Sequence, residues 1–393
     1  MCRKVLILLL ACLVTIGYAA AEALCFSPIH VNPKTGKDLP TYGKTAKKPV
    51  KSIQYALSLA DGNTTILCAA NAVFNESIII DKHQITLKAK NPSLPPTING
   101  SKSGPAISIK GPVRATIQDF IIQNGTIGVS CDSARVELSG STVRNNGRGI
   151  DAEACNIVLS SSTISTNTEY GMHLRRTSTA EIENTQFSDN LSRALYIKDN
   201  AQATILGSKF LNNGERGIAC AYTSSVKVED SEISGNTGDG MIIANNSSGY
   251  LGWEIGTVIS GNGKAGVQVS GSSSLSAEKV TIQGNGSWGA VVGQESSFIV
   301  EGGTINNNGN DGVLVYAHSI FYLNTGTIDH NTGDGIEVQE GSVVRFYAAS
   351  GCSVTENGGY GIRCGQGGNA WSKPASLVDN TLGECFACSG ICP

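Results

Sequence analysis

One short pattern recurs through the chain between residues 124 and 380: an Asn, followed four residues later by Gly and then by an apolar residue. The eleven copies are spaced by 21 to 26 residues, most often by 23, and Ala194 is the only departure from Gly. A fixed period of this length is typical of stacked repeats, and it places equivalent residues in columns. The positions equivalent to Gly are 128, 149, 171, 194, 217, 240, 266, 289, 312, 335 and 361.

Each repeat contains short β-branched stretches separated by Gly, Asn and Ser, and these alternating stretches predict strands. Three strands and three turns fit in about 23 residues, which is one turn of a parallel β-helix. We expect the Asn of every repeat to point inward and to bond its neighbours as a ladder. We expect the Gly before the strand to allow a positive φ or a bulge. Sparse Leu disfavours a leucine-rich solenoid, and a propeller has a longer period, of about 40 to 45 residues.

The N-terminus, residues 1–23, has the pattern of a secretory signal peptide. Arg3 and Lys4 precede an apolar segment, and small residues suited to cleavage follow it. An uncleaved anchor and a lipoprotein modified at Cys12 are the alternatives. Cleavage would leave no membrane span, and the protein would be secreted, periplasmic or on the cell surface.

We expect three further parts: an N-terminal cap at 24–60, a β-helix at 61–380 and a Cys-rich C-terminal cap at 381–393. The stretch 49–60 is the best helix candidate in the chain, because Ile53, Ala56, Leu57 and Ala60 fall on one face. Terminal repeats of a solenoid need a cap, and this amphipathic helix can cover the open end. Early strands are expected at 29–31, 64–67, 78–80 and 85–87.

Ten cysteines remain after signal cleavage, and in an exported protein they favour disulfides. Cys25 and Cys68 are a candidate pair for the N-terminal cap. Cys131 and Cys155 are about one coil apart, so we expect them side by side. Cys220 falls in an inward strand column, which predicts a buried thiol.

The C-terminal cysteines allow two interpretations. Cys364 and Cys385 are 21 residues apart, again about one coil. The tail adds Cys388 and Cys392, and the first interpretation is an end plug held by disulfides. The second is a zinc site made by these three tail cysteines with Cys364.

The composition of the chain argues against nucleic acid as a binding partner. The formal net charge is −3 and 16% of residues are charged, so there is no basic excess for nucleic acid binding. The solenoid counts as one domain because each coil contacts only its neighbours. We expect a monomer.

At this point the chain resembles the right-handed parallel β-helix proteins of the pectate-lyase-like superfamily. The resemblance rests on the coil motif Asn-Thr-Gly-Asp-Gly at 236–240 and 331–335, and on N-terminal motifs at 29–36, 48–53 and 74–78. It implies an all-β fold in a superfamily that contains polysaccharide lyases, glycoside hydrolases, epimerases and non-catalytic adhesins. The Asp-Asp, Gly-His-Gly and Arg-Ile-Lys motifs of polygalacturonases are absent, as is the Asp-Pro-His-Asp motif of alginate epimerases. The motifs therefore indicate a fold and leave the activity open.

Two columns should face outward, one just before each Gly and one two residues after it. Between residues 148 and 216 these columns, with the residue four after Gly, carry both charge signs, two Tyr and one His. Elimination from a uronic acid needs a neutralised carboxylate, a base and an acid, which Arg or Lys, His and Tyr can supply. The alternative is a solvated face whose opposite charges pair between coils. The catalytic candidates are Tyr170, His173, Arg175 and Tyr196, and the substrate-binding candidates are Arg148, Asp151, Arg193, Lys198, Arg216 and Trp288.

A second, acidic set lies on adjacent coils. Asp311, Asp334 and Glu337 are candidate ligands for Ca²⁺, or an acid and base pair for a glycosidic bond. The alternative is that Asp is a common turn residue beside Gly. Apart from this candidate Ca²⁺ site, the sequence predicts no cofactor.

Trp253, Trp288 and Tyr316 could offer stacking surface for sugars, or could pack under loops. Near 265–291 the columns hold Ala265 and Gln268, with no acid or base, so the sequence favours a site at 148–216. We therefore expect an exported protein that binds or processes polysaccharide, with a uronate-type lyase among the options. A non-catalytic surface or adhesion scaffold and a glycoside hydrolase are the alternatives.

Overall fold

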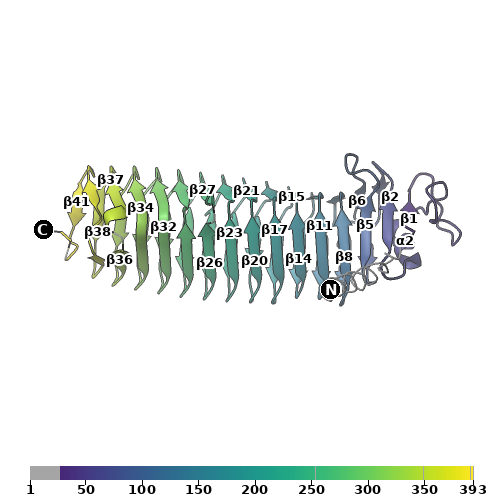
Figure 1. Ribbon diagram of the computed structural model, residues 1–393, viewed down its shortest axis with the longest axis horizontal. Coiled ribbons are helices and arrows are strands. Elements are labelled where there is room, and N and C mark those ends of the chain that lie inside the picture. The colour runs from purple at the N-terminus through teal and green to yellow at the C-terminus, as the bar shows by residue number, and fades with distance from the viewer. Residues whose placement is uncertain (1–26, 253, 348, 390, 393) are drawn as a thin grey trace, which may run out of the picture.

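The computed structural model describes residues 27–252, 254–347, 349–389 and 391–392, so the expected signal peptide, Cys25 and Trp253 lie outside the described residues. The coils stack along one axis, with the N-terminal coils at one end of the rod and the C-terminal coils at the other (Figure 1). Every pairing between the named strands is parallel and joins one coil to the next, for example β13 to β16. This is a parallel β-helix, as the repeat predicts. Among the described residues, no helix is long and apolar enough to cross a membrane.

One strand of each coil belongs to a 14-stranded sheet that forms a continuous face of the rod. We call it the site sheet, because the candidate functional residues lie on it. Its strands, in spatial order, are β4 (Ile78–Ile80), β7 (Ile107–Lys110), β10 (Ile127–Asp132), β13 (Arg148–Glu153), β16 (Met172–Arg175), β19 (Leu195–Ile197), β22 (Ile218–Ala221), β25 (Met241–Ala244), β28 (Val267–Ser270), β31 (Ala290–Val292), β33 (Val313–Val315), β35 (Ile336–Val338), β38 (Tyr360–Cys364) and β41 (Gly383–Phe386).

The remaining strands form a 27-stranded sheet, to which most coils contribute two short strands. In chain order they are β1 (Ile29–Val31), β2 (Thr65–Cys68), β3 (Val73–Phe74), β5 (Ile85–Ala89), β6 (Thr97–Asn99), β8 (Arg114–Gln118), β9 (Ile121–Gln123), β11 (Arg135–Ser139), β12 (Thr142–Arg144), β14 (Asn156–Ser160), β15 (Thr163–Ser165), β17 (Thr179–Glu183), β18 (Gln186–Ser188), β20 (Gln202–Leu206), β21 (Lys209–Leu211), β23 (Ser225–Glu229), β24 (Glu232–Ser234), β26 (Ser248–Gly252), β27 (Val258–Ser260), β29 (Ser274–Glu278), β30 (Thr281–Gln283), β32 (Ser297–Asn306), β34 (Ile320–Asp329), β36 (Val343–Phe346), β37 (Cys352–Thr355), β39 (Asn369–Trp371) and β40 (Ser376–Val378). A short 3₁₀ helix, η1 (Ala349–Gly351), precedes β37.

A ladder of buried Asn side chains runs along the rod, as predicted. From Asn167 onward, each Asn accepts two hydrogen bonds at its Oδ1, from the backbone N–H and the side-chain amide of the Asn one coil earlier, as Asn262 does from Asn236 at 3.1 and 2.9 Å. The ladder differs from the prediction in its first coils. Asn124 and Asn145 have left-handed φ values of 61° and 54°, and Gly125 and Asn146 take the ladder positions. The ladder comprises Asn146, Asn167, Asn190, Asn213, Asn236, Asn262, Asn285, Asn308, Asn331, Asn357 and Asn380.

The Gly column has a different cause from the one we expected. At Gly240 an added Cβ would lie 2.6 Å from the carbonyl oxygen of Gly266 and 2.8 Å from the side-chain nitrogen of Asn262. No carbon can approach a neighbouring backbone so closely, so contact between coils excludes a side chain at Gly240. The positive φ values fall instead at the residue before each ladder Asn, such as Gly235 and Gly261. The expectation of a positive φ at the repeat glycines was wrong.

The N-terminal cap contains α2 (Ile53–Leu59), the only α-helix among the described residues. It is shorter than the predicted 49–60, and Ser52 caps its first turn. Ile53, Ala56 and Leu57 are buried, as the amphipathic pattern predicts. The helix lies beside β1 and β2 at the N-terminal end of the rod (Figure 1). At the other end, β41 continues the site sheet into the range expected for the Cys-rich cap.

Three disulfides lie among the described residues, and the two cysteine spacings of about one coil can be compared with them. Cys131 and Cys155 are bonded, as neighbours one coil apart should be. Cys364 bonds Cys388, so the expected neighbour Cys385 is wrong. The strand register explains the difference. Cys385 pairs with Ile362, so Cys364 lies two residues further along β38 than the residue that faces Cys385.

The other described cysteines complete the comparison. Cys385 bonds Cys392, so all three tail cysteines are oxidised, as the end-plug interpretation predicts. Cys220 is fully buried and outside any disulfide, and burial raises the pKa of its thiol to about 12. Cys68 is fully buried too, and its pairing with Cys25 stays a prediction.

Candidate functional site

The register of the site sheet brings the predicted columns together. Asp151 pairs with His173, and His173 with Tyr196, in three successive strands. Glu153 and Arg175 are likewise opposite each other. Because strands of successive coils lie about 4.8 Å apart, side chains of this column touch. We call Asp151, Tyr170, His173, Arg193 and Tyr196 the His173 cluster.

Asp151 is the buried centre of this cluster, with 5% of its surface exposed. Arg175 donates to both of its carboxylate oxygens, at 3.4 and 3.3 Å, and Arg148 donates to Oδ2 at 3.2 Å. His173 Nδ1 lies 3.1 Å from Oδ1, although this contact is not aligned as a hydrogen bond. Burial alone would raise the pKa of Asp151, but its contacts with His173 and Arg175 outweigh it and lower the pKa to about 2. Asp151 is therefore a fixed negative charge at neutral pH.

The His173 ring is held between two tyrosines. It stacks on Tyr196, with ring centroids 5.3 Å apart and planes 11° apart, and Tyr170 lies at the same distance on a tilted plane. Both imidazole nitrogens are buried, and Nε2 has no hydrogen-bond partner. Tyr170 and Tyr196 are only half-buried. A molecule on this face would therefore meet the tyrosines before His173.

Arg193 covers both tyrosines. Its guanidinium lies 4.4 Å from the Tyr196 ring centroid and 5.8 Å from that of Tyr170, within the range of cation–π attraction. Lys198 also lies 5.7 Å from the Tyr196 ring. The cluster is thus an aromatic surface edged by positive charge.

Most charges on this face are paired between coils, as the alternative interpretation predicts. Arg148 bonds Glu169 at 2.7 Å, and Arg175 bonds Glu153 at 2.6 Å. Glu215 bridges two arginines, Arg193 at 3.2 Å and Arg216 at 2.7 Å. The pairs hold side chains in place and cancel much of the positive charge that an acidic ligand would need.

Next to the His173 cluster the site sheet is hollowed into a groove of about 670 Å³. We call it the Trp288 groove. Its floor includes Val291 and Leu314, which pair in adjacent strands, and Trp288 and Tyr316 line it as aromatic walls. Small residues such as Ala265 line it as well, and they leave the hollow open.

Polar groups surround this floor. Arg216 and Asp239 form an ion pair of 3.3 Å at one end, and Lys264 and Gln268 also line the groove. Trp288 is fixed in orientation, because its indole N–H donates to Asp311 Oδ2 at 3.2 Å. Aromatic surfaces with a few placed polar groups are typical of small-molecule and sugar sites.

Tyr316 is positioned by a glycine one coil earlier. A Cβ added to Gly293 would lie 2.8 Å from the Tyr316 hydroxyl oxygen and nearer still to two ring carbons. The Tyr316 ring therefore occupies the space that any side chain at 293 would need. This glycine is a positioning residue that the repeat pattern did not reveal, because it lies outside the Gly column.

The groove lies where the sequence predicted stacking residues, Trp288 and Tyr316, and no catalytic group. Near 265–291 the outward columns contain no acid or base, but the structure puts the Trp288 groove here. Of the predicted binding residues, Trp288 and Arg216 line the groove. Arg148, Asp151, Arg193 and Lys198 belong to or border the His173 cluster instead.

The acidic set also comes together, and the ligand oxygens of Asp311, Asp334 and Glu337 lie within 4.8 Å of one another. Asp311 accepts the backbone N–H of Asp334 at 2.7 Å, and Asp334 accepts that of Tyr360 at 2.7 Å. Arg363 pairs with both Asp334 and Glu337. Burial, with like charge nearby, raises the pKa of Asp311 and of Glu337.

These contacts give the two aspartates a structural role, as acceptors that join one turn to the next. Asp239 does the same for the N–H of Ala265, at 3.2 Å. Calcium binding stays a prediction, and an ion here would replace Arg363 as the counter-charge. The same holds for an acid and base pair.

Another hollow, of about 590 Å³, lies at the N-terminal cap beside Asp38 and Glu76. Both carboxylates accept hydrogen bonds from backbone N–H groups at the start of α2 or just before it. Asp38 accepts from the N–H groups of Lys51 and Ser52, and Glu76 accepts from those of Ile53 and Gln54. This hollow is therefore part of the helix cap, and the site sheet carries the stronger candidate.

The stacked coils and the grooved face define a β-solenoid with a surface groove. The chain belongs to the right-handed β-helix family, since the family model described as "Right handed beta helix region" matches residues 105–251 and 253–382. The predicted right-handed parallel β-helix is thus confirmed. No curated protein matches the sequence of the chain.

The chain is similar to several solved structures at low sequence identity. The periplasmic alginate epimerase AlgG is 14% identical, with a TM-score of 0.48, over 82% of this chain and 76% of that one. The A-module of the mannuronan C-5 epimerase AlgE4 of Azotobacter vinelandii is 12% identical, with a TM-score of 0.46, over 86% and 95%. The pectate lyase Pel9A is 12% identical, with a TM-score of 0.39, over 91% and 82%.

Proposed function

We propose that this is an exported protein that binds polysaccharide across the site sheet, with sugar rings seated in the Trp288 groove. The observation that carries the proposal is that two aromatic residues, Trp288 and Tyr316, line the same open groove. Sugar rings have apolar faces that stack on aromatic rings, and their hydroxyls hydrogen-bond to groups such as Gln268 and the Arg216–Asp239 pair. An open groove accepts a chain that continues past it in both directions.

Export is supported by two features of the chain. The first is the signal-like pattern at 1–23, and the second is the set of three disulfides, which form and persist in oxidising compartments. A secreted, periplasmic or surface location also gives access to polysaccharide.

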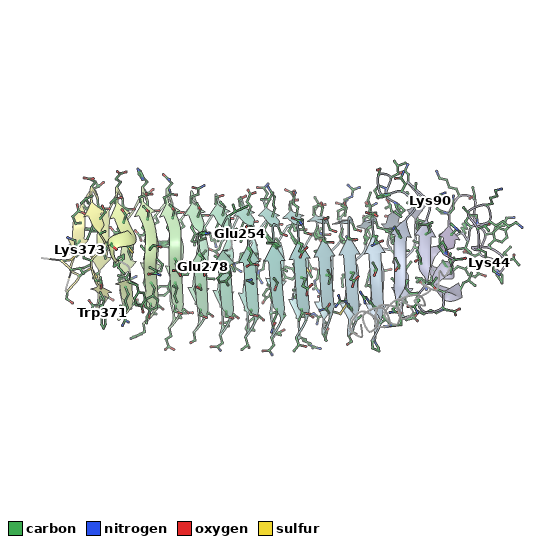
Figure 2. The ribbon with its side chains drawn as sticks, in the orientation of Figure 1. Lys44, Lys90, Glu254, Glu278, Trp371 and Lys373 are labelled. Carbon is green, nitrogen blue, oxygen red and sulfur yellow. A yellow bond between two sulfur atoms is a disulfide. The ribbon has the colours of Figure 1, made fainter. Side chains whose placement is uncertain are left out.

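The test is binding of the mature chain to alginate, polygalacturonate and neutral dextran, measured by affinity electrophoresis and calorimetry. Trp288→Ala should weaken binding to the preferred polymer by about tenfold, the effect of losing roughly 1.4 kcal/mol. Trp371→Ala is the matched control, since Trp371 is half-exposed, belongs to the other sheet and lies near the C-terminal end (Figure 2). Equal affinity of both variants and the wild type would rule out the groove. No binding to any polymer would favour a scaffold role.

A second candidate function is a uronate-type lyase at the His173 cluster, favoured by the contact between Asp151 and His173 beside two tyrosines. In β-elimination a base takes the C5 proton, the C4–O bond breaks, and an acid protonates the departing oxygen. Tyr196 and Tyr170 are the exposed groups for these proton transfers, with His173 behind them. Arg175 and Arg193 would neutralise the substrate carboxylate.

The same polymers, assayed for absorbance of unsaturated products and for reducing ends, test this candidate. Unsaturated product means a lyase. Reducing ends without unsaturation mean a glycoside hydrolase and point to the acidic set. Binding without either product leaves the first proposal alone.

A further inference from the structure

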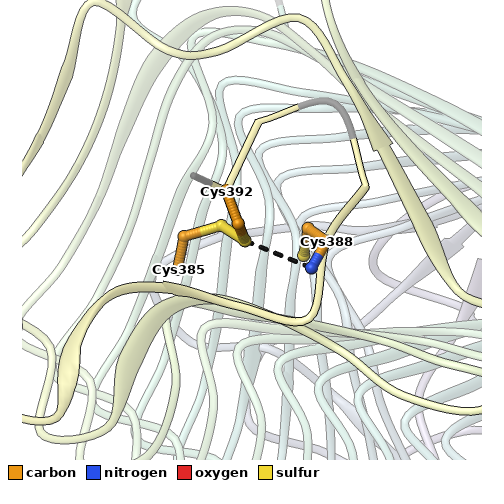
Figure 3. Close-up of side chains that lie close together, drawn as sticks. All are labelled: Cys385, Cys388 and Cys392. Carbon is orange, nitrogen blue, oxygen red and sulfur yellow. Dashed lines mark hydrogen bonds between the residues drawn. A yellow bond between two sulfur atoms is a disulfide. The ribbon is translucent and has the colours of Figure 1, made fainter.

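The sulfur atoms of the C-terminal cap converge on one place. Cys364 ends β38, Cys385 lies in β41, and Cys388 and Cys392 follow in the tail. The sulfurs of Cys385, Cys388 and Cys392 lie within 4.8 Å of one another, and Cys364 is bonded to Cys388. Figure 3 shows Cys388 beside the disulfide of Cys385 and Cys392. Two disulfides are thus in contact, rather than at separate points of the cap.

This arrangement is close to that of a zinc site. In a tetrahedral tetrathiolate centre each Zn–S bond is about 2.3 Å, so the sulfurs are about 3.8 Å apart. Two ligands with two residues between them, as Cys385 and Cys388, are usual in such sites. We propose that, when both disulfides are reduced, Cys364, Cys385, Cys388 and Cys392 bind one Zn²⁺ ion.

A backbone donor already points at one of the sulfurs. The N–H of Cys388 donates to Cys392 Sγ at 3.1 Å (Figure 3). Donors of this kind orient ligating groups and stabilise their negative charge around a metal. The tail is also held by packing, since Cys388 is 1% exposed and Ile391 lies against the core. Once the disulfides are reduced, the two sulfurs of each pair would have to move apart to surround an ion.

The two states are related by a balanced exchange. A phosphine or dithiol reductant supplies two electrons for each disulfide, and with four protons the four sulfurs become thiols. Zinc binding then displaces these protons as the thiolates form. In either state the tail stays attached to β38, by covalent bonds when oxidised and by the metal when reduced. The inference is independent of the proposed polysaccharide binding.

The experiment uses the mature chain reduced with a phosphine, which is not a thiol and competes weakly for metal. Co²⁺ added without oxygen should give the charge-transfer and visible bands of a tetrahedral tetrathiolate, and Zn²⁺ should displace it at one ion per chain. Cys364→Ser and Cys392→Ser should each lose the tetrathiolate spectrum. Cys220→Ala is the matched control, because its buried thiol lies in another coil and outside any disulfide.

Folding is followed by circular dichroism in every sample. A reduced chain that keeps its β signal but binds no stoichiometric metal overturns the proposal. So does a cobalt spectrum with fewer than four sulfurs, or one that Cys364→Ser leaves unchanged. If reduction unfolds the chain, recovery of the β signal with Zn²⁺ supports the site, and failure to recover counts against it.

Discussion

Replacing Gly293 with Ala should weaken polysaccharide binding without unfolding the protein. The new methyl group would lie 2.8 Å from the Tyr316 hydroxyl oxygen and nearer to two ring carbons. Non-bonded carbon atoms are in van der Waals contact at about 3.5 Å, so the Tyr316 ring must move by roughly 1 Å or rotate towards solvent. Gly293 has no positive φ, so the backbone accepts alanine. The substitution therefore acts on the position of Tyr316, and leaves its chemistry intact.

The expected magnitude follows from what the ring does. If Tyr316 is one of two stacking walls, misplacing it loses about 1 to 2 kcal/mol of binding, a factor of roughly 5 to 30. The change in folding stability should be about 1 kcal/mol or less, because Gly→Ala also restricts the unfolded chain.

Calorimetry with the preferred polymer measures the affinity, and thermal unfolding checks the fold. Gly365→Ala is the control, because its added Cβ would meet only Gln339, at an ordinary 4.0 Å. If Gly293→Ala keeps wild-type affinity while Tyr316→Ala loses affinity, the Tyr316 ring contributes to binding but its exact placement does not. Wild-type affinity in both would exclude Tyr316 from the site.

Three further outcomes are expected. Asn262→Ala removes four buried ladder hydrogen bonds and should lower the free energy of unfolding by about 3 to 5 kcal/mol, measured by urea unfolding. A decrease below about 1 kcal/mol would contradict the stabilising role of the ladder. The pKa of Asp151 is lowered from 3.8 to about 2, so its contribution to stability is present above about pH 4 and is lost as the pH falls towards 2. Asp151→Asn should lower the free energy of unfolding by about 2 kcal/mol at pH 7 and should remove most of its pH dependence between about pH 4 and pH 2. An unchanged pH dependence would refute the assignment of this effect to Asp151. If eliminase activity is found, His173→Ala and Tyr196→Phe should each lower kcat by at least about 100-fold, whereas loss in Asp311→Asn alone would move the site to the acidic set.

The fold could be predicted because the same requirements recur in every coil. An Asn that bonds the next Asn, and a Gly that touches the next backbone, must both return at a fixed interval, so the repeat reveals the period. The physical role of each was harder to infer. Gly240 excludes a side chain by contact with Gly266, a distance between coils that no local propensity encodes. The ladder shift at Asn145 likewise depends on a turn that is one residue shorter.

The columns of outward-facing residues on the site sheet could be predicted from the sequence, but the Trp288 groove could not. The pairing of Asp151 with His173 follows from a constant register. The groove depends on side-chain volume, since small residues such as Ala265 lie beside Trp288 and Tyr316. A search for acids and bases overlooks such a surface, because its aromatic side chains carry no acid or base. The Cys364 pairing failed for a similar reason, because the last coil and the tail have no repeat to follow.

The charges on the site sheet explain why the groove is the stronger binding candidate. Arginines of the His173 cluster already form ion pairs with carboxylates, as Arg193 does with Glu215. An acidic ligand would replace one such ion pair with another. Because an ion pair on a solvated surface contributes little free energy, this exchange would add little affinity. The aromatic walls have no such competitor, because water gains nothing comparable from an exposed indole face. Trp288 is also fixed before binding, through Asp311, and so loses little freedom when a sugar arrives. We therefore expect stacking in the groove to contribute more to affinity than the charged columns beside it, whose ion pairs join neighbouring coils.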